Sequence, residues 1–154
     1  MLLDYVRPQP GEVLYDLGCG SGRPMLAASM AWPELHSCVG IELMPQVYEL
    51  GNKVALKFNS LCTERNMPHA PVSVICGDIL EIDWSSADII FFASVLFPVD
   101  ALEAAADQMA RLKPGTRIIS LREMPKRDYL TLEAACFVRF SWGIHEALFY
   151  KRAV

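Results

Sequence analysis

The stretch VLYDLGCGSGRPMLAASMAW, residues 13–32, carries the pattern that decides the fold. A short apolar run, typical of a buried strand, leads into a turn with glycines at alternate positions, Gly18, Gly20 and Gly22. Pro24 then marks the first turn of a helix. Glycine has no Cβ, so it permits unusual backbone angles and lets a ligand approach the main chain. Open α/β sheets bind ligands outside the carboxyl ends of their strands, so the stretch predicts a ligand-binding loop.

The spacing of these glycines differs from two common nucleotide-binding loops. It is G-x-G-x-G rather than the dinucleotide pattern G-x-G-x-x-G, and the loop lacks the Lys and Ser/Thr of a P-loop. Two carboxylates stand at the ends of the next two predicted strands. Glu42 ends the second strand and is placed to accept from ribose hydroxyls; Asp78 follows the third and is placed to accept from an adenine amino group. Each carboxylate has a structural alternative: Asp16 can order the loop, Glu42 can be a solvated strand end, and Asp78 can form a turn with Gly77. Taken together, the three features predict an adenosine pocket.

Outward from this stretch, apolar runs alternate with helical patterns. The runs predicted as strands are 12–17, 37–43, 72–76, 88–93, 116–121, 136–142 and 146–152. Helical patterns lie between the first five runs, and 98–115 is one of them. In the clearest, Pro45 precedes one apolar stripe, made of Val47, Leu50, Val54, Phe58 and Leu61. Strands alternating with helices predict right-handed βαβ units and a parallel sheet.

The alternation breaks at the end of the chain. Only residues 143–145 separate the last two runs, which is too short for a parallel crossover and suits an antiparallel hairpin. The predicted fold is therefore a Rossmann-like α/β sheet of seven mostly parallel strands, with a C-terminal antiparallel hairpin and helices on both faces. The length of the chain predicts one domain, over residues 1–154.

Composition narrows the function classes. The net charge is −4 and no Lys/Arg block of five occurs, which argues against direct nucleic-acid binding. The sequence shows neither an apolar run of membrane-spanning length nor a signal peptide, so no membrane partner is expected. The cysteines are scattered without metal-ligand spacing, which predicts reduced core thiols, an intracellular protein and no metal site; they are Cys19, Cys38, Cys62, Cys76 and Cys136.

Four segments, VLYDLGCGSG, VGIEL, CGDIL and RLKPGTRIIS, resemble the successive motifs of class I S-adenosylmethionine-dependent methyltransferases. The resemblance covers nearly the whole chain and implies S-adenosyl-L-methionine as cofactor. It also implies a set of cofactor-binding residues in three groups. These are Asp16, Gly18 and Gly20 at the methionine end, Glu42 at the ribose, and Asp78 with Ile79 at the adenine. Cys19, Gly22 and Leu43 are further expected cofactor-binding residues.

A narrower resemblance concerns the methyl acceptor. The segment GDILEIDWSSADIIFFASVLFP, followed by LKPGTRIISLRE and FSWGIHEALFYKR, is similar to the non-SET histone-lysine methyltransferases of the disruptor-of-telomeric-silencing type. The Asn/Asp-Pro-Pro-aromatic motif of DNA and amide-nitrogen methyltransferases is missing from the fourth strand. The resemblance implies a protein substrate with a lysine acceptor, possibly a histone, and nuclear localisation if it is a histone, otherwise cytoplasmic. It assigns the catalytic side to Ser94, Phe97 and Trp142, with Phe92 and either Phe149 or Tyr150 nearby.

Two departures from that family keep alternatives open. Ala93 and Ser94 stand where relatives carry Asn, and MLLDYVRPQPGE matches no upstream segment that folds over the cofactor. We therefore expect an N-terminal lid segment to be missing from this chain. The acidic balance favours a small-molecule methyltransferase as the second hypothesis, and Ala93 with the missing lid favours a cofactor-binding domain without catalysis as the third. Core packing is the competing explanation for the aromatic residues.

Overall fold

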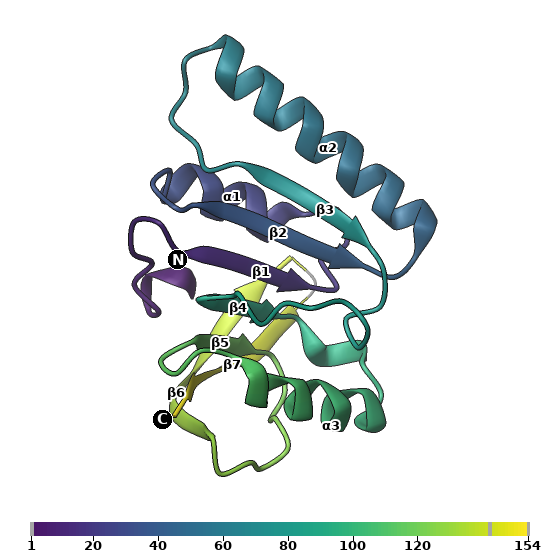
Figure 1. Cartoon of the computed structure of the whole chain (residues 1–154), viewed down its shortest axis with the longest axis vertical. Helices are drawn as coiled ribbons and strands as arrows, with labels where there is room; N and C mark the ends of the chain where they lie inside the picture. Colours follow the sequence, from purple (N-terminus) through teal and green to yellow (C-terminus); the bar gives the residue numbers. More distant parts are fainter. Residues whose placement is uncertain (1, 142, 154) are drawn as a thin grey trace.

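A computed structural model describes residues 2–141 and 143–153 (Figure 1). The strands are β1 (Val13–Leu17), β2 (Ser37–Glu42), β3 (Val72–Cys76), β4 (Ile89–Phe92), β5 (Arg117–Ser120), β6 (Leu130–Phe140) and β7 (Gly143–Arg152). The α-helices are α1 (Arg23–Ala31), α2 (Pro45–Glu64) and α3 (Val99–Gln108). Short 3₁₀ helices are η1 (Leu2–Asp4), η2 (Ser94–Leu96) and η3 (Met109–Arg111).

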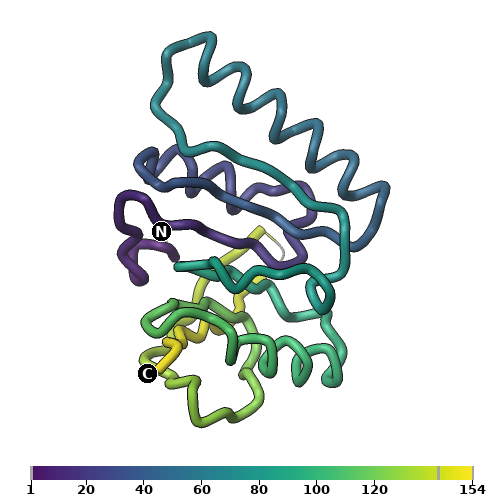
Figure 2. Tube along the Cα trace, viewed as in Figure 1, coloured from purple at the N-terminus to yellow at the C-terminus, as the bar shows by residue number. Residues whose placement is uncertain are grey.

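The seven strands form one sheet in the order β3-β2-β1-β4-β5-β7-β6. The first five are parallel, whereas β7 runs antiparallel to both β5 and β6. The arrowheads of β1, β2 and β3 point to the same side of the molecule, and Figure 2 shows the chain before β1 and the end of β7 on the opposite side. The predicted mostly parallel sheet with a C-terminal hairpin is confirmed.

Helices cover both faces of the sheet, as predicted. Because side chains alternate along a strand, neighbouring residues enter different cores. Phe91 belongs to the core beneath α1 and α2, whereas Phe92 belongs to the core beneath α3. Both phenylalanines are buried, so β4 is apolar on each face, as expected for a central parallel strand.

The predicted helix between β3 and β4 is wrong. Within residues 77–88, all of which the structure describes, no helix joins β3 to β4. Asp78 and Asp83 instead accept main-chain N–H groups two residues ahead, a turn geometry that competes with helix formation. Trp84, only 1% exposed, fills the space against the sheet.

The predicted apolar stripe of α2 packs only in part, through Phe58, which lies against the core. Leu50 is 55% exposed, and the fully buried positions are the small residues Gly51, Ala55 and Cys62. The helix approaches the sheet on its small side chains, because these allow the closest contact between backbones. The strand β6 also begins six residues earlier than position 136, since it pairs with the whole length of β7 and absorbs an irregularity between Leu132 and Ala134.

Candidate functional site

The loop after β1, residues 18–22, is called the glycine-rich loop below. Gly18, Gly20 and Gly22 have φ angles of +75°, +56° and +79°, in the left-handed region that residues with a side chain rarely adopt. The N–H groups of Gly18 and Cys19 both donate to the carbonyl of Ile41, at 2.9 and 3.0 Å. The loop is therefore held against β2, at the carboxyl edge of the sheet. Gly22 caps α1, in which Pro24 occupies the first turn as predicted.

Glu42 joins this loop to the start of α2. Its Oε2 accepts the N–H of Gly20 at 2.9 Å, and its Oε1 accepts the N–H of Met44, the N-cap residue of α2, also at 2.9 Å. The side chain is nearly buried, whereas the adjacent Leu43 is 61% exposed. A carboxylate oxygen accepts more than one hydrogen bond, so these contacts leave acceptor capacity for a ligand hydroxyl.

Asp16 lies buried beneath the same loop, with 1% of its surface exposed. Its Oδ2 has no hydrogen-bond partner among the residues that the structure describes. Burial raises the pKa of Asp16 to about 8, and the nearby charge of Glu42 adds to the effect. A cationic group bound at this edge would compensate the isolated carboxylate. Burial likewise raises the pKa of Cys19 to about 12, which disfavours its thiolate form.

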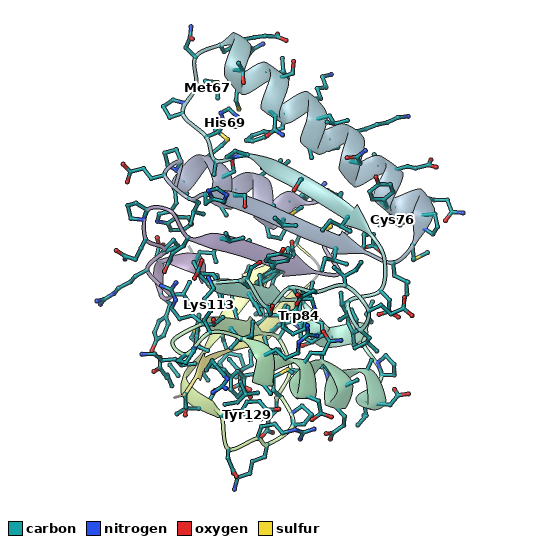
Figure 3. All side chains as sticks on the ribbon, viewed as in Figure 1. Met67, His69, Cys76, Trp84, Lys113 and Tyr129 are labelled. Carbon is teal, nitrogen blue, oxygen red and sulfur yellow. The ribbon has the colours of Figure 1, made fainter. Side chains whose placement is uncertain are left out.

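The predicted adenine side is at the neighbouring strand end. The N–H of Gly77 donates to the carbonyl of Glu42 at 3.0 Å, which brings the ends of β2 and β3 together. Asp78 accepts the N–H of Leu80 through Oδ1 at 2.8 Å, so it forms the turn that was its structural alternative. Ile79 is buried, and its carbonyl accepts the indole N–H of Trp84 at 2.8 Å. Figure 3 shows Trp84 between the parallel strands and α3.

On the predicted acceptor side, Phe97 meets the glycine-rich loop. A Cβ on Gly18 would lie 3.1 Å from the Cζ atom of Phe97, so the ring packs directly over that glycine. Phe97 also contacts Phe92 edge-on, with 4.8 Å between ring centroids. Ser94 is fully buried, and its Oγ lies 2.8 Å from the Oγ of Ser120. The structure therefore brings Phe97 to the loop and leaves Ser94 within the protein.

The remaining described aromatic candidates, Phe149 and Tyr150, lie on different faces of the sheet. Trp142 lies outside the described residues. Phe149 packs against Tyr5 on the face that carries α1, with 4.1 Å between ring centroids, so it lies on the other face from Phe92. Tyr150 is on the same face as Phe92, and its hydroxyl accepts the N–H of Met124 at 3.0 Å.

A hollow lies apart from the glycine-rich loop. This hollow, of about 810 Å³, lies between the chain before β1 and the C-terminal hairpin, where Tyr5, Val138 and Phe149 line it together with Cys136. None of the cofactor-site candidates lines that hollow.

Among the residues that the structure describes, no group of three His, Cys, Asp or Glu side chains could hold a metal ion. None of their helices is long and apolar enough to cross a membrane.

Sequence reasoning missed two glycines that shape the site. Gly40 in β2 faces Cys19 and Met25, and a Cβ there would lie 2.5 Å from the Cys19 Sγ. Gly51 in α2 faces the carbonyl of Gly20. The available signal was a lone glycine inside an otherwise regular helix or strand pattern, which often marks a close approach of two backbones.

Two lysine methyltransferases are similar to this chain in sequence. The chain is 25% identical to a histone-lysine N-methyltransferase, H3 lysine-79 specific, from Debaryomyces hansenii, with 99% of this chain and 15% of that protein covered. It is also 25% identical to a protein-lysine N-methyltransferase from Saccharolobus islandicus, over 77% of this chain and 67% of that protein. The chain thus spans less than a sixth of the length of the Debaryomyces relative.

A solved structure shares the fold. It is an RNA methyltransferase from Salinibacter ruber in complex with S-adenosyl-L-homocysteine, with a TM-score of 0.67 and 21% identity. The match covers 99% of this chain and 88% of that one, so the fold is that of the class I methyltransferases. Residues 1–137 match the family model described as histone methylation protein DOT1. This chain, with its glycine-rich loop and terminal hairpin, belongs to the DOT1 family of histone methylation proteins.

Proposed function

We propose that this chain binds S-adenosyl-L-methionine at the glycine-rich loop and transfers its methyl group to a lysine nitrogen of a protein, with a histone as substrate. Membership of the DOT1 family supports the reaction class. The names of the two relatives, one specific for H3 lysine-79 and one a protein-lysine methyltransferase, support the substrate class. A histone substrate implies a nuclear protein, and another protein substrate a cytoplasmic one.

The observation that carries the proposal is the buried, unpartnered Oδ2 of Asp16. An orphaned carboxylate oxygen suits a cation, and this cofactor carries a sulfonium and an ammonium group. Asp16 and the glycine-rich loop would hold its methionine end, because Asp16 lies at the end of β1, two residues before Gly18. Glu42 with Leu43 would hold the ribose. Asp78 with Ile79 would hold the adenine.

The chemistry needs little proton-transfer machinery. When bound, the cofactor supplies a methyl group on a positively charged sulfur. The attacking lysine must be neutral, and the half-buried ring of Phe97, which packs on the buried Phe92, would lower the pKa of an ammonium group by desolvation. The ring of Phe97 beside Gly18 would restrict the direction of approach, so a large part of the rate enhancement would come from positioning.

Ser94 and Trp142 are the two other catalytic candidates, and we propose a different role for each. Ser94 would have to give up its partner Ser120 before its hydroxyl could contact an acceptor. We therefore assign it first to holding the end of β4 against the end of β5. Trp142 stays a proposed wall of the acceptor channel, as the resemblance implies.

Cofactor binding is the first test. Titration calorimetry with S-adenosyl-L-methionine and S-adenosyl-L-homocysteine should show saturable binding to the wild-type chain. Glu42→Ala and Asp78→Ala should each weaken it, whereas Glu49→Ala, an exposed carboxylate on α2, should leave it unchanged. If neither compound binds, the assignment of the glycine-rich loop to this cofactor is wrong.

Methyl transfer is the second test. The chain is incubated with cofactor labelled in its methyl group and, separately, with nucleosomes, free histones, RNA and a metabolite extract. Label on a lysine Nζ, located by mass spectrometry, supports the proposal. Label confined to a small molecule would favour the second hypothesis. Binding without transfer to any acceptor would favour a domain without catalysis.

A further inference from the structure

Gly51 places α2 in direct contact with the glycine-rich loop. A Cβ at residue 51 would lie 2.8 Å from the carbonyl oxygen of Gly20 and 3.9 Å from both the Gly20 carbonyl carbon and the Ser21 Cα. All of these atoms are main chain, so no change of side-chain rotamer would relieve the clash. Either the loop or the helix would have to move.

The loop peptide that Gly51 contacts is restrained on its other side as well. The N–H of Gly20 donates to Glu42, and the same carboxylate accepts the N–H of Met44 at the start of α2. Glu42 therefore ties the loop to the first residue before the helix, and Gly51 lies against the loop two turns later. Gly20 itself has a φ of +56°, a backbone angle that residues with a side chain rarely adopt. The Glu42 hydrogen bond and the contact with Gly51 therefore help to hold this peptide in place.

We infer that Gly51 is a positioning residue for the cofactor: its missing side chain sets how closely α2 approaches, and so where the main-chain groups of Gly20 lie. The inference rests on the proposed function, because cofactor affinity is the property it governs. Gly51 acts through Gly20.

A purely structural role would give a different result. In the interior of a helix, alanine is more favourable than glycine, so Gly51→Ala raises the intrinsic stability of α2. If the glycine served only the packing of the helix, the variant would change the unfolding midpoint and leave cofactor affinity alone. If it positions the loop, affinity falls even where stability does not.

The experiment compares Gly51→Ala and Gly51→Val with Asn52→Ala, which improves helix propensity at the neighbouring position. Calorimetry measures the dissociation constant of S-adenosyl-L-homocysteine, and amide NMR of the ligand-free protein follows Gly20 and Ser21. We expect Gly51→Ala to weaken binding by roughly three- to tenfold and to shift both amide resonances, with a larger effect in Gly51→Val. Asn52→Ala should bind like the wild type.

Failure of the inference is distinguishable from failure of the proposed function. If the wild type and Gly51→Ala bind with equal affinity, Gly51 is a packing residue and the inference is wrong, while the proposed function stands. If the wild type binds neither S-adenosyl-L-methionine nor S-adenosyl-L-homocysteine, both are wrong. In an active preparation, Gly51→Ala should raise the KM for the cofactor more than it lowers kcat.

Discussion

The Asp16 carboxyl should make the stability of the ligand-free protein depend on pH. Burial, with a contribution from the charge of Glu42, raises its pKa to about 8, whereas in the unfolded chain an aspartate titrates near pH 4. Between these values the folded protein holds a proton that the unfolded chain has released. The free energy of unfolding therefore falls by about 1.4 kcal/mol for each pH unit, or about 5 kcal/mol across the window. Above pH 8 the dependence ends.

Urea unfolding at pH 5, 6, 7 and 8 measures this effect, with Asp16→Asn as the variant that carries no titrating group. Relative to Asp16→Asn, the wild type should lose about 1.4 kcal/mol in free energy of unfolding for each unit that the pH rises. Asp128→Asn makes the same chemical change at an exposed position and should not alter the slope. Parallel pH profiles for the wild type and Asp16→Asn would refute the reasoning. Between pH 5 and pH 7, affinity for the cationic cofactor should rise, because binding favours the ionised carboxylate.

Three further substitutions test the supports of the site by urea unfolding. In Gly40→Ala the new Cβ would lie 2.5 Å from the Cys19 Sγ, and this overpacking should destabilise the protein by about 1–3 kcal/mol; an unchanged midpoint would mean that β2 and the loop adjust freely. Trp84→Phe removes the donor to the carbonyl of Ile79, and leaving that buried group unpaired should cost about 1–3 kcal/mol. A neutral result there would show that water replaces the indole. Leu96→Ser, at a side chain that is 94% exposed, should change stability by less than about 0.5 kcal/mol, and a larger loss would reveal packing at η2.

The strands and the loop could be predicted because their signals are local. A continuous apolar run of four to seven residues identifies a strand covered on both faces, and β1 to β5 lie within one residue of the predicted runs at either end. Glycines at alternate positions identify the turn after β1, because the left-handed φ angles of Gly18, Gly20 and Gly22 exclude most other residues. The short gap before β7 identifies an antiparallel pair.

The face of α2 that packs could be predicted only in part from periodicity. Phe58 of the predicted stripe packs against the core, but Leu50 is exposed. The fully buried positions are small residues beside the stripe, among them Gly51 and Ala55. Hydrophobic periodicity measures which positions share a face, not how near another backbone can come. Closeness of approach depends on the partner surface, here the carbonyl of Gly20.

By itself, the sequence determined the order of strands along the chain, the glycine-rich loop and the carboxylates Asp16 and Glu42 at the carboxyl edge. Only the tertiary structure decided what these groups contact. The pairing of Gly20 with Glu42, the ring of Phe97 over Gly18 and the hydrogen bond between Ser94 and Ser120 join residues at least 22 positions apart. Local patterns report contacts within one helical turn or one strand, whereas these contacts follow from how whole elements stack on the sheet.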